Sequence, residues 1–202
     1  MSSSTGNEAT RHLDLGCGAV PRNPYRRGHV FGIDISAQIS AGNVTVVSAN
    51  LALQPIPFPD AHFDSVSAYD FLEHVPRVLP RADGSGTRFP FIELMNEISR
   101  VLKPGGLFYA LTPAYPSEEA FVDPTHVNIL ARRSHVYFVG PKPLARMYGF
   151  NGRFVLRRAE PVVYRDSVDP LAPFGAAQRW RRLRHRLKRK LAYLAWEFER
   201  AA

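Results

Sequence analysis

The sequence predicts an α/β protein built on a doubly wound, mostly parallel β-sheet, and two observations lead to this fold class. Short apolar segments of about five to seven residues recur along the chain with helix-length gaps between them, which is typical of buried parallel strands. Residues 89–102 instead repeat their apolar side chains at intervals of three and four, as the buried face of a helix does. The 202 residues suffice for one domain with a substantial core.

Each element follows from its local sequence. The predicted strands are residues 12–15, 29–35, 44–49, 63–69 and 107–111. The helix at 89–102 ends at a Lys-Pro-Gly-Gly sequence, because proline and glycine terminate helices. Residues 112–133 are rich in proline and are expected to form an irregular loop beside the ligands. A short helix over 143–148 and two antiparallel edge strands over 153–158 and 161–164 are expected to follow.

Composition divides the chain into three parts. Residues 1–10 are small and polar, and we expect them to be disordered. Residues 11–166 form the predicted globular domain, with 112–150 as a lid region, and residues 167–202 form a basic tail. The net charge is +8, and residues 179–190 contain eight Lys or Arg and no acid, which leaves 18 basic against 18 acidic residues elsewhere. The basicity is therefore a local property of the tail.

The tail is predicted to be one amphipathic helix. Its large apolar residues recur at intervals of three and four, and they are Trp180, Leu183, Leu187, Leu191, Leu194 and Phe198. Such a helix could dock its apolar stripe on the domain or on a second copy of the chain, forming a homodimer. It could also lie on an anionic membrane through residues 179–198, or bind the phosphates of a nucleic acid. Nucleic acid is the least favoured, because the neutral main body offers no continuous basic groove.

Three features bear on the location of the protein. Cys17 is the single cysteine and has no disulfide partner within the chain, which favours a reducing compartment. The sequence begins without an apolar leader, and it contains no apolar run of about 18 residues. We therefore expect a cytoplasmic protein, peripheral at the inner face of the membrane where the tail binds lipid.

Two glycines and one acid predict a ligand site at the edge of the sheet. Gly16 and Gly18 directly follow the first strand, where glycine lets the backbone turn sharply and lets a ligand approach closely. Asp34 lies at the end of the second strand, where a carboxylate can accept hydrogen bonds from both hydroxyls of a ribose. Because ligands of doubly wound sheets bind at this carboxyl edge, the three residues predict a nucleotide-like ligand.

Five segments in the same order resemble class I S-adenosylmethionine-dependent methyltransferases, from about Arg11 to Leu111. They are LDLGCG (13–18), GIDIS (32–36), PFPDAHFDSV (57–66), YDFLEHV (69–75) and EISRVLKPGG (97–106). The resemblance implies S-adenosylmethionine as the cofactor, with Gly16 and Gly18 at its methionine part and Asp34 at its ribose. The cofactor site that the resemblance implies also includes Asp14, Cys17, Ile35, Asn50, Leu51 and Tyr69.

The sequence departs from the family pattern at three points. Asn50 stands where the family often has an aspartate for the adenine amino group, and its side-chain oxygen can still accept that hydrogen bond. The thirteen residues between Gly18 and Gly32 include two prolines, so the first helix is expected to be short or irregular. Only eight residues follow Ile35 before the third strand, so the second helix is nearly absent. A nicotinamide dinucleotide is the alternative cofactor, but the third glycine of Gly-x-Gly-x-x-Gly is missing and position 21 is proline.

The proline-rich loop supplies candidate catalytic groups. Asp123 to Asn128 resembles a sequence in a subgroup of these methyltransferases that is associated with surface-glycan or other sugar-containing products. An oxygen acceptor must lose a proton, and His126 and His74 are the candidate bases, with Asp123 or Glu73 as orienting partners. The histidines show neither His-x-x-x-His nor Cys-x-x-Cys spacing, so the sequence predicts no metal.

The predicted function is transfer of a methyl group from S-adenosylmethionine to a hydroxyl of a sugar, a glycan-linked molecule or another small acceptor. Two alternatives stay open. One is an RNA or protein methyltransferase that the basic tail anchors, and the other is a catalytically inactive partner subunit that keeps the methyltransferase fold. The shortened helices and Asn50 make the inactive subunit conceivable.

Overall fold

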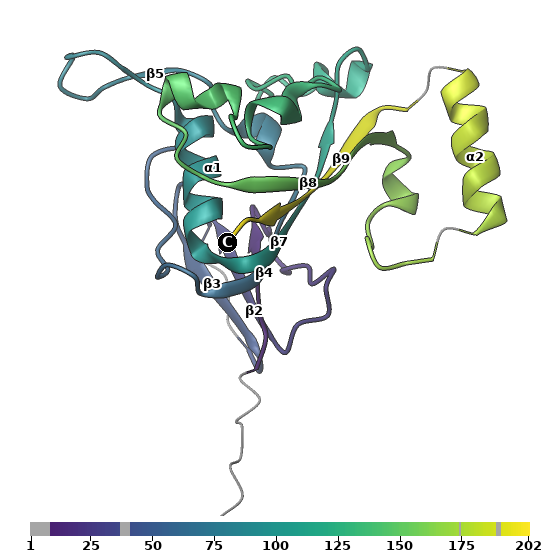
Figure 1. Ribbon diagram of the computed structural model, residues 1–202, viewed down its shortest axis with the longest axis horizontal. Coiled ribbons are helices and arrows are strands. Elements are labelled where there is room, and N and C mark those ends of the chain that lie inside the picture. Colours follow the sequence, from purple (N-terminus) through teal and green to yellow (C-terminus); the bar gives the residue numbers. More distant parts are fainter. Residues whose placement is uncertain (1–8, 37–40, 174, 189–190) are drawn as a thin grey trace, which may run out of the picture.

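The computed structural model describes residues 9–36, 41–173, 175–188 and 191–202 (Figure 1). Its main sheet consists of β1 (Arg11–Leu15), β2 (His29–Asp34), β3 (Val44–Ser48), β4 (Phe63–Tyr69), β7 (Leu102–Pro113), β8 (Phe154–Val162) and β9 (Tyr193–Arg200). A small hairpin pairs β5 (Leu79–Pro80) with β6 (Thr87–Arg88). The α-helices are α1 (Pro90–Val101) and α2 (Ala176–Leu187). Short 3₁₀-helices are η1 (Leu72–His74), η2 (Glu118–Ala120), η3 (Ser134–Tyr137), η4 (Leu144–Tyr148) and η5 (Tyr164–Asp166). Most of the N-terminal segment expected to be disordered, residues 1–8, lies outside the described residues.

The strand order confirms the predicted fold class. The strands lie in the order β3-β2-β1-β4-β7-β9-β8, and the first five of them are parallel. The register pairs Leu15 with Ile33 of β2 and with Ala68 of β4. The carboxyl ends of β1, β2 and β4 therefore meet at one edge of the sheet, which is where ligands of doubly wound sheets bind.

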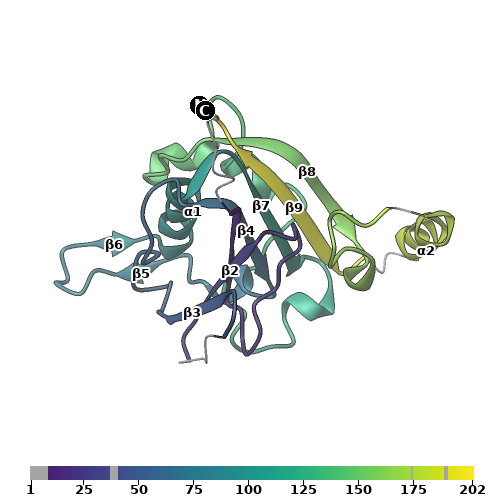
Figure 2. The same ribbon diagram turned by 90° about the horizontal axis from the view of Figure 1, so that it is seen from below.

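One face of the sheet packs against α1, as the apolar repeat of residues 89–102 predicts (Figure 2). The helix begins at Pro90, and proline suits the first helical position because an N–H there would have no helical partner. The buried apolar residues of this helix include Phe91, Leu94, Met95 and Ile98. They form the main core together with side chains of β1, β4, β7 and β9, so α1 is the chief covering of this face.

The opposite face of the sheet carries a buried polar network. His12 Nδ1 lies 2.8 Å from Ser65 Oγ, and His12 Nε2 lies 2.9 Å from Ser67 Oγ. The Ser67 hydroxyl donates to Asp14 Oδ1 at 2.5 Å, so Ser67 Oγ accepts the proton on His12 Nε2. Burial, followed by the charge of Arg27, lowers the pKa of His12 to about 3 and keeps the imidazole neutral.

Irregular segments cover this polar face where many doubly wound proteins have helices. Within residues 16–28 the structure contains no helix, which confirms the expectation of a short or irregular first helix. The Tyr25 hydroxyl of this segment donates to Glu197 of β9 at 2.9 Å. The second covering segment follows β8, and its Val168 carbonyl accepts from the Tyr69 hydroxyl at 2.8 Å. The layer therefore combines side-chain hydrogen bonds to the sheet with the packing of Tyr25 against Tyr69 and Tyr109.

The C-terminal tail corrects the sequence prediction, because only its first part is helical. Helix α2 ends at Leu187, and residues 193–200 form β9, which lies inside the sheet between β7 and β8. Leu194, Trp196 and Phe198 alternate at intervals of two and are 1%, 0% and 0% exposed. The long strand β7 needs a hydrogen-bonding partner along its outer edge, and this tertiary pairing outweighs the helical spacing of the same residues. The domain therefore extends from β1 to Arg200 and does not stop at residue 166.

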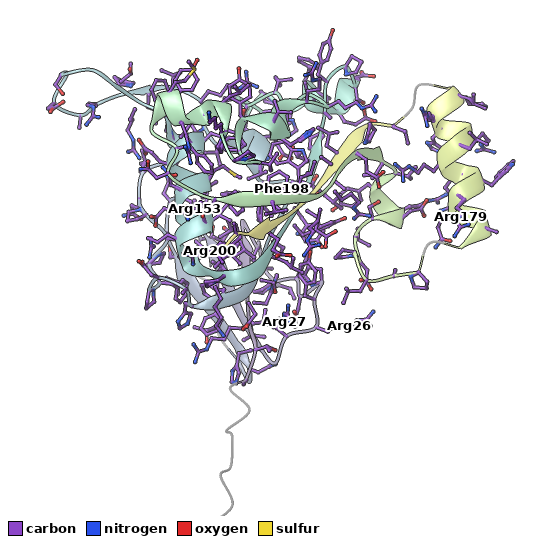
Figure 3. All side chains as sticks on the ribbon, viewed as in Figure 1. Arg26, Arg27, Arg153, Arg179, Phe198 and Arg200 are labelled. Atoms are coloured by element: carbon purple, nitrogen blue, oxygen red, sulfur yellow. The ribbon has the colours of Figure 1, made fainter. Side chains whose placement is uncertain are left out.

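Two further differences concern the edge of the sheet and α2. The two short edge strands predicted over 153–158 and 161–164 form one strand, β8, with an irregularity between Leu156 and Arg158. Helix α2 stands beside the sheet and has no buried residue, and Figure 3 shows Arg179 on this helix far from Phe198 in the sheet. No helix in the described part of the chain combines the length and apolar character that a membrane crossing requires.

Candidate active site

The tips of β1 and β2 face each other at the carboxyl edge of the sheet. Gly16 and Gly18 follow β1 with φ angles of 64° and 58°, a region that glycine adopts without strain. The backbone N–H of Gly18 donates to Asp34 Oδ2 at 2.9 Å, and that of Ser36 donates to Asp34 Oδ1 at 3.1 Å. These bonds fix the carboxylate at the strand tip, as a site for a ribose requires.

Each glycine of this edge has its own steric reason. A Cβ on Gly16 would lie 2.4 Å from Cδ2 of Phe71, so the turn passes directly over that ring. A Cβ on Gly32 would lie 2.6 Å from Cys17 Sγ and 2.6 Å from Pro21 Cγ. The segment after β1 can therefore pack against β2 only because position 32 has no side chain. Around Gly18 nothing lies within 4 Å of the Cβ position, which leaves space over the strand tip. Gly16 and Gly32 therefore lie where a side chain would clash, whereas the space beside Gly18 is open.

Three residues assigned to the cofactor site lie beneath it. Asp14 is fully buried, and its Oδ2 accepts from the Arg22 backbone N–H at 2.8 Å while its Oδ1 accepts from Ser67. Burial raises the pKa of Asp14 to about 6. Cys17 is 4% exposed, and burial raises the pKa of its thiol to about 11, so it is no thiolate nucleophile at neutral pH. The Tyr69 hydroxyl donates to a backbone carbonyl, and Arg22 lies 4.7 Å above its ring. These side chains support the edge from below.

The other three assigned residues lie beside the open edge in different ways. Ile35 follows Asp34 and is 74% exposed, so it offers an apolar surface next to the carboxylate. Asn50 is exposed, but its side-chain Oδ1 already accepts from the Ala52 backbone N–H at 3.1 Å. Leu51 is 6% exposed and packs in the core. The Asn50 oxygen thus shapes the turn after β3, and its second lone pair can still accept from another donor.

A second polar cluster lies beyond the tip of β4 and contains the four candidate catalytic residues. Glu73 is 1% exposed, and its Oε2 accepts from the Thr112 hydroxyl at 3.1 Å. Its backbone carbonyl accepts from the N–H groups of Val127 and Asn128, both at 2.9 Å, which joins η1 to the proline-rich loop. Burial raises the pKa of Glu73 to about 7, and the nearby carboxylates of Asp70 and Asp123 act in the same direction.

The two histidines of this cluster pack edge to face. The ring centroids of His74 and His126 are 4.8 Å apart at 73°. His74 Nδ1 lies 3.0 Å from Thr125 Oγ1, and the Thr125 hydroxyl donates to Asp123 Oδ1 at 2.6 Å. His126 Nε2 is 4.0 Å from Asp123 Oδ2, which is too far for a hydrogen bond. Asp123 therefore orients His74 through Thr125, and the structure brings all four sequence-predicted residues together.

Sequence reasoning missed a third acidic group and two tyrosines at the same edge. Asp70 follows β4 with a φ of 49°, an unusual value for a residue other than glycine. Burial raises the pKa of Tyr164 to about 12, and its hydrogen bond to Asp70 adds to this. Burial and Asp70 likewise raise the pKa of Tyr193, whose ring lies 4.7 Å from that of Tyr164. The backbone conformation of Asp70 and the strand position of Tyr193 leave no signal in the local sequence.

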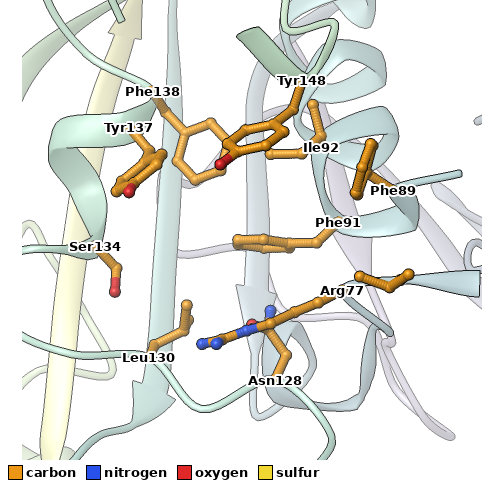
Figure 4. Close-up of a pocket in the computed structure, with 11 residues that line it drawn as sticks. Arg77, Phe89, Phe91, Ile92, Asn128, Leu130, Ser134, Tyr137, Phe138 and Tyr148 are labelled. Atoms are coloured by element: carbon orange, nitrogen blue, oxygen red, sulfur yellow. The ribbon is translucent and has the colours of Figure 1, made fainter. Parts of the chain in front are cut away.

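An aromatic pocket lies on the far side of the same loop (Figure 4). It has a volume of about 430 Å³, and the rings that line it belong to Phe89, Phe91, Tyr137, Phe138 and Tyr148. Arg77 reaches this pocket, and its Nε donates to Asn128 Oδ1 at 2.7 Å. Asn128 Nδ2 in turn donates to the Leu72 carbonyl at 3.0 Å. Asn128 therefore connects the pocket, which it lines, with the Glu73 cluster, to which its backbone N–H bonds.

Comparisons with known proteins agree with this geometry. Residues 13–110 match the family model described as a methyltransferase domain. The demethylmenaquinone methyltransferase of Geobacillus kaustophilus (strain HTA426) is 29% identical over 124 residues, which cover 53% of this chain. The chain spans about half of that relative, since the match covers 47% of its length.

Solved structures share the fold at low sequence identity. One is the complex of the Haloferax volcanii Trm112 methyltransferase activator with a putative methyltransferase, at a TM-score of 0.59 and 16% identity, covering 96% of this chain and 84% of that one. Another is a geranyl diphosphate methyltransferase in complex with S-adenosylmethionine. Its TM-score is 0.57 and its sequence identity 14%, and the match covers 96% of this chain and 79% of that one. At these identities the likeness concerns the fold.

The strand tips fit S-adenosylmethionine as the cofactor. Asp34 presents a fixed carboxylate at the end of β2, and the space over Gly18 is open for the adenosyl and methionine parts. Five ordered motifs, the strand order and the matched family model agree on one interpretation. Residues 13–110 thus match a methyltransferase domain in sequence, and their strand order and strand tips agree with that match.

Proposed function

We propose that this protein transfers a methyl group to a hydroxyl oxygen of a small acceptor, in the first place a sugar or a glycan-linked molecule. The observation that carries the proposal is the cluster of Glu73, His74 and His126 next to the cofactor edge. A hydroxyl must lose its proton when it is methylated, and imidazole and carboxylate groups are the side chains that assist this loss. An acceptor without an acidic proton would make little use of such a buried polar group.

The residues of the chain have separate tasks in this scheme. S-adenosylmethionine supplies the methyl group on a positively charged sulfur. Asp34 and the turn at Gly16 orient the cofactor from the tips of β1 and β2. The Glu73 cluster holds the acceptor hydroxyl and assists the loss of its proton, with His74 oriented by Thr125 and Asp123. Alignment of the two reactants is the main contribution, and good positioning can be worth about 7–11 kcal/mol.

The aromatic pocket supports a cyclic acceptor. A volume of about 430 Å³ falls within the usual range of small-molecule sites. Aromatic rings such as Tyr137 and Tyr148 can stack on the apolar face of a sugar or on an aromatic ring. Arg77 adds a charged donor for hydroxyl or carboxylate groups. Because Asn128 lines this pocket and also bonds to the Glu73 carbonyl, an acceptor bound there would extend its hydroxyl toward the Glu73 cluster.

The test is release of S-adenosylhomocysteine from panels of sugar-containing and aromatic hydroxyl compounds. We expect turnover with at least one class and a loss of turnover of at least about tenfold for His126→Ala, with unchanged heat of S-adenosylmethionine binding. His135→Ala is the matched control, because His135 lies on η3, where its Nδ1 bonds to the Arg132 carbonyl, and is not a member of the Glu73 cluster. Cofactor binding without turnover on any hydroxyl compound, or wild-type turnover in His126→Ala, would contradict the proposal.

We also propose that α2 attaches the protein to an anionic membrane surface. Trp180, Leu183 and Leu187 are 63%, 54% and 76% exposed and lie on one side of the helix at intervals of three and four. Arg184, which lies 5.2 Å from the Trp180 ring, and other cations surround this stripe. Exposed apolar residues flanked by cations suit lipid headgroups, with about 1 kcal/mol of attraction per basic residue. The proposed lipid contact is limited to α2, since β9 is buried in the sheet.

A further inference from the structure

The second polar cluster has the composition of a metal site. One ligand atom from each of Glu73, His74 and His126 can be chosen so that all three lie within 4.8 Å of one another. Glu73 and His74 are adjacent in η1, whereas His126 comes from the proline-rich loop 52 residues later. Local spacing therefore gives no indication of this set, and the expectation of no metal depended on that spacing alone.

Two atoms of this cluster are buried and without a hydrogen-bond partner among the described residues. They are Oε1 of Glu73 and Nδ1 of His126. Such atoms are rare, because an unsatisfied buried polar atom costs about 1–3 kcal/mol. Glu73 is 1% exposed and its other oxygen bonds to Thr112, so the free oxygen points into the cluster and away from solvent. His74 uses Nδ1 toward Thr125, which leaves Nε2 for another partner.

Negative charge gathers around the same point. Asp123 belongs to the same loop as His126 and accepts from the Thr125 hydroxyl, which in turn contacts His74 Nδ1. Asp123 Oδ2 also lies 4.0 Å from His126 Nε2. Among the described residues no Lys or Arg forms an ion pair with Glu73, whose carboxylate bonds to the neutral Thr112 hydroxyl. A cation between Glu73 and the two imidazoles would satisfy the free atoms and the excess charge together.

We propose that Glu73, His74 and His126 bind one divalent first-row transition-metal ion. The inference depends on the proposed function, because the ion would act on the acceptor hydroxyl. Two imidazoles and one carboxylate suit Mn²⁺, Fe²⁺, Co²⁺ or Zn²⁺, and a set of three protein ligands leaves coordination positions for an acceptor oxygen. Bonds of about 2.0–2.2 Å separate neighbouring donors by about 3–3.5 Å. The three side chains would therefore move inward by roughly 1–2 Å on binding.

The ion would give this cluster a defined chemical task. A hydroxyl bound to a divalent cation ionises more readily, because the cation stabilises the alkoxide. The oxygen then forms a bond to the methyl carbon while the carbon–sulfur bond breaks. Its electron pair stays on sulfur as the neutral thioether S-adenosylhomocysteine, and the hydroxyl proton passes to water. No oxidant or reductant takes part, so any of the four ions can serve.

The experiment measures binding of Co²⁺ to the full chain, prepared without a polyhistidine tag and stripped with EDTA. We expect one equivalent of Co²⁺ by calorimetry, with visible absorption bands of nitrogen- and oxygen-coordinated Co²⁺. Glu73→Gln and His126→Asn are expected to weaken binding by at least about tenfold, which corresponds to 1.4 kcal/mol. His29→Asn is the matched control, since His29 begins β2 at the opposite edge of the sheet and is expected to leave binding unchanged.

The outcomes separate this proposal from the proposed function. Because Glu73 is buried and its variant could misfold, the less buried His126→Asn and the circular dichroism spectrum of each variant accompany it. Co²⁺ binding that is absent, or that is the same in wild type and folded His126→Asn, overturns the metal site. Stoichiometric Co²⁺ binding without methylation of any hydroxyl compound upholds the site and contradicts the proposed reaction. Undiminished methylation of a hydroxyl in EDTA upholds the reaction and overturns the role of the metal.

Discussion

The backbone N–H of Gly18 donates to Asp34 Oδ2 at 2.9 Å, so the two residues that mark the cofactor site in the sequence bond to each other in the structure. This bond connects the tips of β1 and β2 and orients the carboxylate toward the open edge. A carboxylate oxygen has room for more than one donor, so Asp34 can bond to Gly18 and a ribose hydroxyl together. The turn and the acid therefore function as one unit.

Replacing Asp34 tests this unit directly. We expect Asp34→Ala to weaken S-adenosylmethionine binding by at least about tenfold in calorimetry, because the ribose loses its acceptor and the Gly18 turn loses its anchor. The domain is expected to stay folded, since Asp34 lies at a strand end. Asp83→Ala removes the same charge from the loop between β5 and β6 and serves as the control. Equal affinities in the two variants would rule out the ribose assignment.

The two turn glycines are expected to differ in their tolerance of alanine. Both have positive φ, and a residue with a side chain there costs about 1–2 kcal/mol. Gly16→Ala also places its Cβ 2.4 Å from the Phe71 ring, whereas Gly18→Ala meets nothing within 4 Å. Urea unfolding should therefore show a clearly larger loss of stability for Gly16→Ala. Equal losses would mean that the turn does not pass over Phe71 as described.

The two tryptophans provide a matched test of the tail. Trp196→Ala is expected to lower the free energy of unfolding by about 3–5 kcal/mol, because the residue is fully buried within the sheet. Trp180→Ala is expected to change it by less than about 0.5 kcal/mol, since that side chain is 63% exposed. Trp196→Phe gives a milder variant if the alanine variant does not fold. Similar small effects at both positions would favour the helical tail that the spacing suggests.

His12 is expected to make stability depend on pH. Its folded pKa of about 3 lies below the ordinary 6.5, so the unfolded chain binds the proton more readily and stability falls as the pH drops below 6.5. From pH 6.5 to 5 this amounts to about 2 kcal/mol at 1.36 kcal/mol per unit. The raised pKa of Asp14 has the opposite effect, because it increases stability as the pH falls from about 6 to about 4. This contribution of Asp14 is present in both wild type and His12→Asn. Urea midpoints at pH 5, 6 and 7 should fall more steeply in wild type than in His12→Asn, and parallel curves would contradict the neutral histidine.

Helix α2 is expected to bind vesicles that contain anionic lipid and not neutral vesicles. Binding should decrease with rising salt, because the cations of the helix interact with headgroups through screened charges. Replacing Trp180, Leu183 and Leu187 by alanine should reduce co-sedimentation with anionic vesicles without altering stability, since all three are exposed. Salt-sensitive binding to single-stranded RNA in place of vesicles would favour the nucleic-acid alternative.

The local sequence was sufficient for features that short-range physics controls. The glycines at the tip of β1 and the acid at the end of β2 occupy fixed positions along the chain, and helix α1 follows from its own apolar repeat. Pro21 and Pro24 explain why no regular helix follows β1. These features need only neighbouring residues, so the fold class and the cofactor edge could be predicted.

The tail shows where local sequence was insufficient. The apolar residues of 180–198 recur with a helical period, but Leu194, Trp196 and Phe198 also alternate with the period of a strand. The pairing of this segment with β7 decides in favour of the strand. The surroundings of Asp14 also come from tertiary structure, because its full burial and its bonds to Arg22 and Ser67 join separate segments of the chain.

From the sequence alone came the parallel sheet, the glycine turn and the acid beside it, because each depends on residues close together along the chain. Tertiary structure alone decided that the tail completes the sheet and that one ligand atom each of Glu73, His74 and His126 can lie within 4.8 Å of the others. The reason is physical: strand pairing and side-chain convergence over long separations depend on the packed chain, and no local pattern encodes them.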